Sequence, residues 1–133
     1  MALKIAIVTP DHEALDIECD EVVAPGANGE IGLLAGHVPL ITALRPGVLT
    51  VIAGGRRSHY AVSSGFAEVD ADRVTILTEA CEEAAKVDAD RARRALEQAE
   101  SALASLAQDD VGFAEPERRS LRARARLDAA ARR

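Results

Sequence analysis

The chain has 133 residues, of which 48% are hydrophobic but only 2% aromatic, and its formal net charge at pH 7 is −6. This length allows one ordinary domain with a small appendage, whose core must consist mainly of Val, Ile, Leu and Ala. The acidic balance argues against nucleic-acid binding, and no apolar run approaches the about 20 residues that span a bilayer.

The cysteines and the N-terminal segment indicate a soluble protein of a reducing compartment. Cys19 and Cys81 lie far apart and belong to no metal-binding or redox motif, which is typical of free thiols. The first apolar run is too short and too soon followed by acidic residues for a signal peptide. We therefore expect a cytoplasmic chain with no direct membrane insertion.

The first half of the chain is rich in β-branched residues and glycine, which predicts short strands. Turn signals separate these strands, as in an antiparallel sandwich. In one of them, AGGRR, Gly54 and Gly55 can adopt positive φ. In the segment RVTIL, Val74 and Ile76 should share one face of a strand. The expected strands are 4–9, 14–23, 40–44, 48–52, 58–63, 66–70 and 73–78.

The second half is rich in alanine, with 13 alanines in residues 87–133, and this composition predicts helices. Asp88 is an expected N-cap, Gly112 marks a turn, and Pro116 fits the first turn of a second helix. Helices lined by alanine bury little area, so the hairpin should be loosely attached. The predicted fold is α+β, with an N-terminal antiparallel β-sandwich (1–79), a linker (80–86) and a C-terminal α-helical hairpin (87–133, helices at about 88–107 and 115–131).

The segment NGEIGLLAGHVPLITALRPGVL, residues 28–49, is apolar but interrupted by glycine, proline and a histidine. His37 has no second histidine at a metal-binding spacing and no recognisable nucleophile, so we interpret it as part of a bend with a locally bonded imidazole. Gly29, Gly32 and Gly36 do not form a phosphate loop, because no lysine follows and no helix opens there. We expect a bent part of the sheet that offers a surface to a partner, and no catalytic or metal site.

Two arginine-containing segments leave alternatives open. In VDADRARRA, which begins at Val87, Asp88 either caps an exposed basic turn or belongs to a nucleotide site in which Arg91 faces phosphate. Residues 118–126, RRSLRARAR, lack interleaved aromatic residues, which argues against nucleic acid. That segment is either a solvated helix face or a contact for an acidic protein partner.

Four segments together carry a family resemblance: KIAIVTPD, GEIGLLAGHVPLITALRPG, SSGFAEVDADRVTILTEA and VDADRARRALEQAE. They resemble the epsilon subunit of bacterial F-type ATP synthases, which is called delta in mitochondria, over nearly the whole chain. The resemblance implies a β-sandwich with a helical hairpin in a non-catalytic rotor subunit of the central stalk, coupling the gamma subunit to the c-ring. It also implies a peripheral location on the cytoplasmic face of the bacterial inner membrane, as part of the F1 sector.

The resemblance further implies which residues meet the partners. Gly29, Glu30 and Ile31 match the family's edge that faces the c-ring, and His37 matches its region that faces gamma. In many members the hairpin extends along gamma toward the alpha/beta hexamer and inhibits ATP hydrolysis. For contact with the beta subunit, the resemblance points to Arg118, Arg119, Arg122 and Arg126.

Some members of the family bind ATP at the base of the hairpin, and this chain matches most of that motif. The matching residues are Glu82, Val87, Asp88, Arg91, Ala92, Arg122 and Arg126. Tight binders carry a further arginine where Gln98 or Ala99 stands here, and losing one charged contact to phosphate costs about 1.5–3 kcal/mol. We therefore expect no cofactor, and regulatory ATP binding that is weak or absent.

A second interpretation of the same features is a free-standing β-sandwich that senses a nucleotide under a helical lid. The two interpretations differ in their binding partners. A rotor subunit should copurify with gamma, whereas a sensor should bind ATP by itself.

Overall fold

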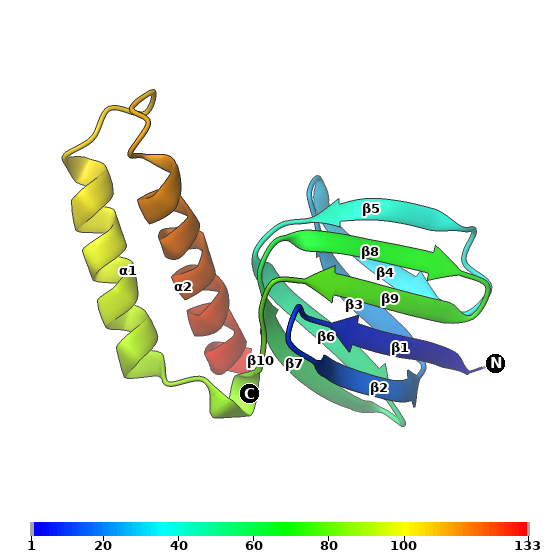
Figure 1. The fold of residues 1–133 in the computed structure, drawn as a ribbon. Coiled ribbons are helices and arrows are strands. Elements are labelled where there is room, and N and C mark those ends of the chain that lie inside the picture. Colours follow the sequence, from blue (N-terminus) through cyan, green and yellow to red (C-terminus); the bar gives the residue numbers. More distant parts are fainter. Residues whose placement is uncertain (1, 133) are drawn as a thin grey trace.

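The structure is a computed structural model that describes residues 2–132 as a β-sandwich with a helical hairpin at its side (Figure 1). The strands are β1 (Leu3–Val8), β2 (Glu13–Cys19), β3 (Glu21–Gly26), β4 (Gly29–Leu34), β5 (Leu40–Leu44), β6 (Gly47–Ala53), β7 (Arg56–Val62), β8 (Gly65–Asp70), β9 (Arg73–Thr78) and β10 (Cys81–Glu83). A 3-10 turn, η1 (Ala84–Lys86), leads to the helices α1 (Ala89–Ala104) and α2 (Ala114–Arg132). This arrangement confirms the predicted α+β class.

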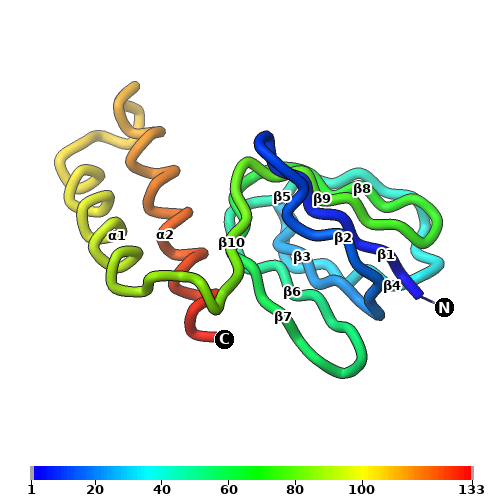
Figure 2. The backbone as a smooth tube through the Cα atoms, turned by 60° about the horizontal axis from the view of Figure 1, so that its bottom comes forward, coloured from blue at the N-terminus to red at the C-terminus, as the bar shows by residue number. Residues whose placement is uncertain are grey.

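The strands form one hydrogen-bonded sheet that is folded into two layers. Its order is β10-β7-β6-β3-β5-β8-β9-β1-β2, and β4 pairs with β3 beside this path. Figures 1 and 2 show β5, β8, β9, β1 and β2 in one layer and the other strands in the second. The neighbouring strands are antiparallel except β1 and β9, which run parallel with Ile5 opposite Val74 and Ile7 opposite Ile76.

Aliphatic side chains from both layers fill the core. On β9, Val74 and Ile76 are completely buried while Leu77 is 45% exposed, so the predicted alternation is confirmed. Burying each such side chain contributes about 1.5–3 kcal/mol. The largest fully buried side chains are Leu3, Ile5, Ile7, Val22, Leu33, Leu49, Val51, Val62, Val69, Val74 and Ile76.

The chain crosses from one layer to the other at Asp20, where the sequence predicted a single strand over residues 14–23. That prediction is wrong because Asp20 forms a corner between β2 and β3. Its N–H donates to the Ile52 carbonyl at 2.7 Å, and its carboxylate accepts from the Gly54 N–H at 2.9 Å. Gly54 lies in the tight turn between β6 and β7 and has a φ of 59°, in agreement with the predicted hairpin.

A buried pair of hydroxyl side chains holds the bend between β9 and β10. Ser63 Oγ lies 3.2 Å from Thr78 Oγ1, and the Ala80 N–H donates to Ser63 Oγ at 3.0 Å. Thr78 Oγ1 also donates to the Ser63 carbonyl at 3.0 Å. These bonds direct β10 onto β7, with Cys81 opposite Val62. The segment 80–86, which was expected to be a linker, therefore contributes a strand to the sheet before η1.

Among residues 2–132, the hairpin meets the sandwich mainly through α2. α2 packs on β6 and β7, whereas α1 packs on α2 and lies farther from the sheet (Figures 1 and 2). Asp88 caps α1 by accepting from the Arg91 N–H at 3.1 Å, as predicted. Pro116 lies in the first turn of α2, where its missing N–H leaves no helical hydrogen bond unmade.

Candidate functional site

The predicted partner edge at Gly29, Glu30 and Ile31 forms the first half of β4. Gly26 and Gly29 face each other where β3 and β4 meet, and a Cβ on Gly26 would lie 2.7 Å from the Gly29 carbonyl oxygen. Glu30 is exposed and lines a hollow of about 470 Å³ together with Arg124 of α2. The structure therefore brings this edge close to the docked hairpin.

His37 lies in the bend before β5 and is bonded locally, as the sequence predicted. Its Nδ1 lies 2.8 Å from the Val38 carbonyl oxygen, which can only accept, so this nitrogen is the donor. The preceding Gly36 has a φ of 82°, and its N–H donates to Asp72 Oδ1 at 3.2 Å. These bonds tie the bend to the turn between β8 and β9.

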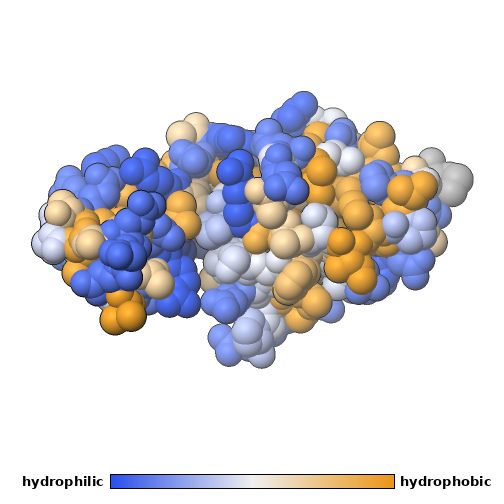
Figure 3. All heavy atoms as spheres, turned by 90° about the horizontal axis from the view of Figure 1, so that it is seen from above, coloured by the Kyte–Doolittle hydropathy of each residue, from blue (hydrophilic) through white to orange (hydrophobic). Residues whose placement is uncertain are grey.

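An exposed apolar surface lies next to this bend on the outer face of β5, β8 and β9. We call it the apolar face and define it by Val38, Ile41, Phe66 and Leu77, which are 70%, 71%, 55% and 45% exposed. Phe66 lies opposite Ala43 on one side and Leu77 on the other. Figure 3 shows hydrophobic residues gathered on the sandwich. Apolar patches of this kind mark interaction surfaces.

The apolar face continues into a hollow of about 660 Å³ at the end of the sandwich, where Phe66 and Leu77 meet Pro10 and Ala43. Sequence reasoning predicted a partner surface within residues 28–49, which contain Val38 and Ile41, but missed its extension to Phe66 and Leu77, because it used strand alternation only to choose the core. A signal was present, since Phe66 and Leu77 are apolar at positions that alternate with buried ones and would ordinarily be polar.

The base of the hairpin brings together three of the residues predicted for nucleotide binding. Arg126 Nε lies 2.8 Å from Glu82 Oε1, and Arg122 lies one helical turn before Arg126. All three line a hollow of about 270 Å³ between α2 and the β7–β10 pair. Residues of α2 line one side of the hollow, and residues of β7 and β10, including Ala61, Val62 and Cys81, line the other.

The remaining residues of that predicted set lie at the start of α1 and do not line the same hollow. Val87 and Ala92 are buried, and Asp88 is occupied in capping the helix. Arg91 is exposed. The hollow therefore contains Glu82, Arg122 and Arg126 of the predicted set, and the other four residues stay a prediction.

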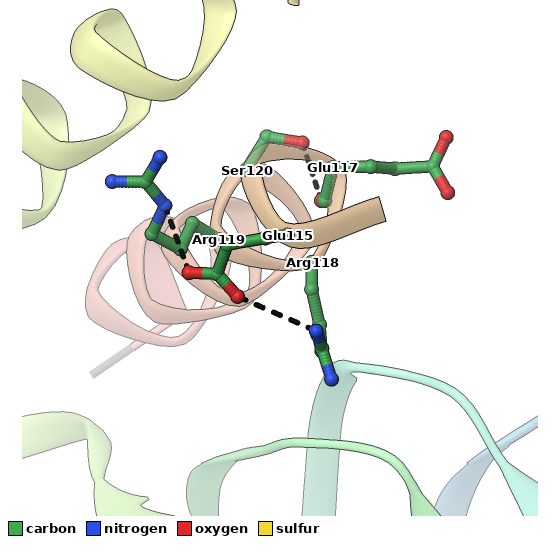
Figure 4. A network of polar contacts seen from close by, with 5 residues as sticks. All are labelled: Glu115, Glu117, Arg118, Arg119 and Ser120. Carbon is green, nitrogen blue, oxygen red and sulfur yellow. Dashed lines mark hydrogen bonds and ion pairs between the residues drawn. The ribbon is translucent and has the colours of Figure 1, made fainter. Parts of the chain in front are cut away.

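The arginines predicted to contact a beta subunit lie along α2. Arg118 and Arg119 both pair with Glu115, at 3.3 and 3.2 Å, and Figure 4 shows the carboxylate between the two guanidinium groups. Arg122 forms no ion pair within residues 2–132. Arg122 thus offers a free guanidinium group, while Arg126 is held by Glu82.

Burial and neighbouring charges shift the pKa values of the Cys81 thiol and the His59 imidazole. Burial, followed by the neighbouring carboxylates of Glu83 and Glu82, raises the pKa of the Cys81 thiol to about 11, so the thiol is uncharged at neutral pH. Burial, followed by Arg132 and Arg57, lowers the pKa of His59. Across residues 2–132, no cluster of three potential ligands could hold a metal ion, and neither helix is long and apolar enough to cross a membrane.

Comparison with known proteins agrees with this architecture. Residues 2–84 match the family model "ATP synthase, Delta/Epsilon chain, beta-sandwich domain". An ATP synthase epsilon chain of Anaeromyxobacter dehalogenans is 46% identical over 99% of this chain and 100% of its own length. One from Geobacter metallireducens is 42% identical over 96% of this chain and 93% of its own length.

Solved structures show the same fold with both units present. A chain in a structure of the Euglena gracilis mitochondrial ATP synthase, which contains OSCP, F1 and the c-ring, superposes with a TM-score of 0.83. It is 27% identical, and the match covers 98% of this chain and 81% of that one. Because the family model covers more than half of the chain and the relatives match nearly all of it, we conclude that the chain belongs to the ATP synthase epsilon chain family.

Proposed function

We propose that the chain is a non-catalytic rotor subunit in the central stalk of an F-type ATP synthase, peripheral to the cytoplasmic face of the bacterial inner membrane. The observation that carries this proposal is the apolar face, in a chain whose full-length relatives are ATP synthase epsilon chains. A rotating subunit must stay attached to the shaft under load, which favours an apolar contact over an exposed ionic one. The apolar face is therefore the surface that we assign to the gamma subunit.

We assign the neighbouring edge at Gly29, Glu30 and Ile31 to the polar loops of the c-ring. Glu30 is an exposed carboxylate at the end of a rigid two-strand hairpin, a suitable position for a polar contact. His37 lies in the bend beside Val38, so it would border the gamma contact rather than form its centre. Together the two surfaces would let the sandwich couple gamma to the c-ring.

We further propose that the hairpin inhibits ATP hydrolysis when it extends toward the alpha/beta hexamer. The arginines of α2 would then meet an acidic segment of the beta subunit through charge-assisted hydrogen bonds. In the docked state the ion pairs of Arg118 and Arg119 are exposed, so exchanging their partner costs little. Nucleotide binding at the base of the hairpin stays a prediction, and it would require ATP to replace Glu82 on Arg126.

Replacing Arg118, Arg119 and Arg122 together with alanine should raise ATP hydrolysis by the assembled enzyme severalfold. Each lost charged hydrogen bond weakens the extended, inhibitory state by about 1.5 kcal/mol or more. The measurement is the ATPase rate of the purified complex containing the variant. Arg93→Ala is the matched control, because Arg93 also forms an exposed ion pair within its own helix but lies on α1. An unchanged rate in a normally assembled complex would argue against inhibition through α2.

A chain truncated after Lys86 should fold and bind the gamma subunit. All the residues of the main core lie before this point, and β10 is retained to cover β7. Circular dichroism should show a cooperative β-sheet unfolding transition, and copurification should detect gamma binding. A chain truncated after Glu79, which loses β10 and the cover over Tyr60, should unfold at a lower temperature. An unfolded 1–86 fragment would contradict the proposed division at residue 86.

A further inference from the structure

One ion pair joins the hairpin to the sandwich, and we call it the latch, formed by Glu82 of β10 and Arg126 of α2. The other ion pairs among residues 2–132 lie within one helix, within η1 and its flank, or between α1 and α2. The side chains of the latch are 37% and 23% exposed, whereas the side chains in the other pairs are 48–77% exposed. Partial burial makes its attraction stronger than that of the exposed pairs, while both side chains keep enough contact with water for salt to screen them.

The apolar contact that accompanies the latch is small. Its buried cluster is formed by Val48, Ala61, Ala84 and Ala129, and three of these four side chains are single methyl groups. Ala125 of α2, which is also buried, adds one more methyl group. Alanine burial contributes little, because the hydrophobic effect scales with the apolar area removed from water. An ion pair of ordinary strength is therefore a large share of what holds α2 on the sheet.

The surroundings of Arg126 make its pairing with Glu82 decisive for docking. Arg122 lies one turn away on the same helix and lines the same hollow without an ion pair of its own among the described residues. Without Glu82, docking α2 would place two guanidinium groups together over a partly buried surface. Leaving one partner of a buried pair uncompensated costs more than the pair itself contributes.

We propose that the Glu82–Arg126 latch holds the hairpin on the sandwich without any bound ligand, and that the docked fraction falls as ionic strength rises. The latch is a property of the isolated chain. Its consequence for the enzyme rests on the proposed inhibitory function, because release of the latch would favour the extended hairpin. Docking would then respond to salt and to charge, in addition to any nucleotide.

The test measures the ratio of docked to undocked hairpin in the isolated full-length chain by methyl NMR relaxation dispersion of Val48, Ala61 and Ala129. Arg126→Gln should lower this ratio at least about fivefold, because a partly buried pair worth about 1 kcal/mol is lost and Glu82 is left without its partner. Arg122→Gln is the matched control, since it removes an equal charge from the same helix face and hollow, and it should not lower the ratio. Raising NaCl to about 1 M, where the screening length is about 3 Å, should lower the ratio for the wild type but not for Arg126→Gln.

A second variant tests whether the effect of Arg126→Gln comes from the lost ion pair or from local misfolding of α2. Glu82→Gln leaves the helix unchanged and should lower the ratio as Arg126→Gln does, while the core methyl groups of Val22 and Val51 keep their shifts. Exchanging the charges, with Glu82→Arg and Arg126→Glu in one chain, should restore docking in part. Equal behaviour of the Arg122 and Arg126 variants, or a wild-type ratio that does not respond to salt, would overturn the latch.

The assembled enzyme separates the latch from the proposed function. Glu82→Gln frees Arg126 for the extended state, so it should lower ATP hydrolysis, whereas the triple arginine variant of α2 should raise it. If Glu82→Gln undocks the isolated hairpin but leaves hydrolysis unchanged, the latch stands and the inhibitory function fails. If the NMR ratio does not change, the latch fails whatever the hydrolysis rate.

Discussion

Replacing Phe66 with glutamate should weaken binding of the gamma subunit by at least about 30-fold while the sandwich stays folded. Phe66 lies at the centre of the apolar face, between Ala43 and Leu77, and is 55% exposed in the free chain. Loss of a central aromatic contact typically costs about 2–4 kcal/mol, which corresponds to about 30-fold to 1,000-fold weaker binding. Burying the new carboxylate without a partner adds to this cost. The measurement is isothermal titration of gamma into the variant, with copurification as a second readout.

A substitution at an equally exposed leucine gives the control for this experiment. Leu34 is 54% exposed but lies on β4, which contributes none of the four residues that define the apolar face. Leu34→Glu should therefore bind gamma almost as the wild type does. Both variants should unfold near the wild-type temperature, because exposed substitutions usually change stability by less than about 0.5 kcal/mol. Full binding by Phe66→Glu, or equal loss in both variants, would show that gamma binds elsewhere.

Replacing Gly65 with alanine should destabilise the sandwich by about 3 kcal/mol or more. A Cβ at Gly65 would lie 1.9 Å from the Leu77 carbonyl oxygen and 2.9 Å from Thr78 Cα, and both atoms belong to the backbone of β9. The strands can relieve this overlap only by giving up the pairing of Gly65 with Thr78. Overpacking in a rigid interior costs about 1–3 kcal/mol, and lost strand pairing adds to it. Urea unfolding at equilibrium measures the change.

Gly32→Ala provides the comparison for Gly65→Ala. Gly32 also lies within a strand, but the nearest atom to an added Cβ is Glu21 Oε2 at 3.1 Å, the end of a flexible side chain. Its unfolding midpoint should stay close to that of the wild type. Whole domains have free energies of unfolding of only about 5–15 kcal/mol, so the destabilisation by Gly65→Ala should shift the urea midpoint by an easily measured amount. Similar midpoints for the two variants would mean that β8 and β9 are not paired as described.

The sequence predicted contacts between residues that are close in the chain, but not contacts between residues that are far apart in it. Asp88 as the cap of α1 and His37 as a locally bonded side chain involve neighbours within a few residues, and both were predicted correctly. The pairing of Glu82 with Arg126 spans 44 residues and depends on where α2 comes to lie. The apolar face combines side chains from three strands, so it exists only after β5, β8 and β9 are aligned.

The sequence by itself determined the element types and the two-part organisation of this chain. Alternation of buried and exposed residues in β9, glycine in the turn between β6 and β7, and alanine-rich composition after residue 87 act locally, so they can be interpreted without a fold. Only the tertiary structure decided that the chain turns at Asp20, that β10 joins the sheet, and that α2 docks through Glu82. Each of these depends on hydrogen bonds or charges between residues distant in sequence, and no local pattern encodes which distant groups will meet.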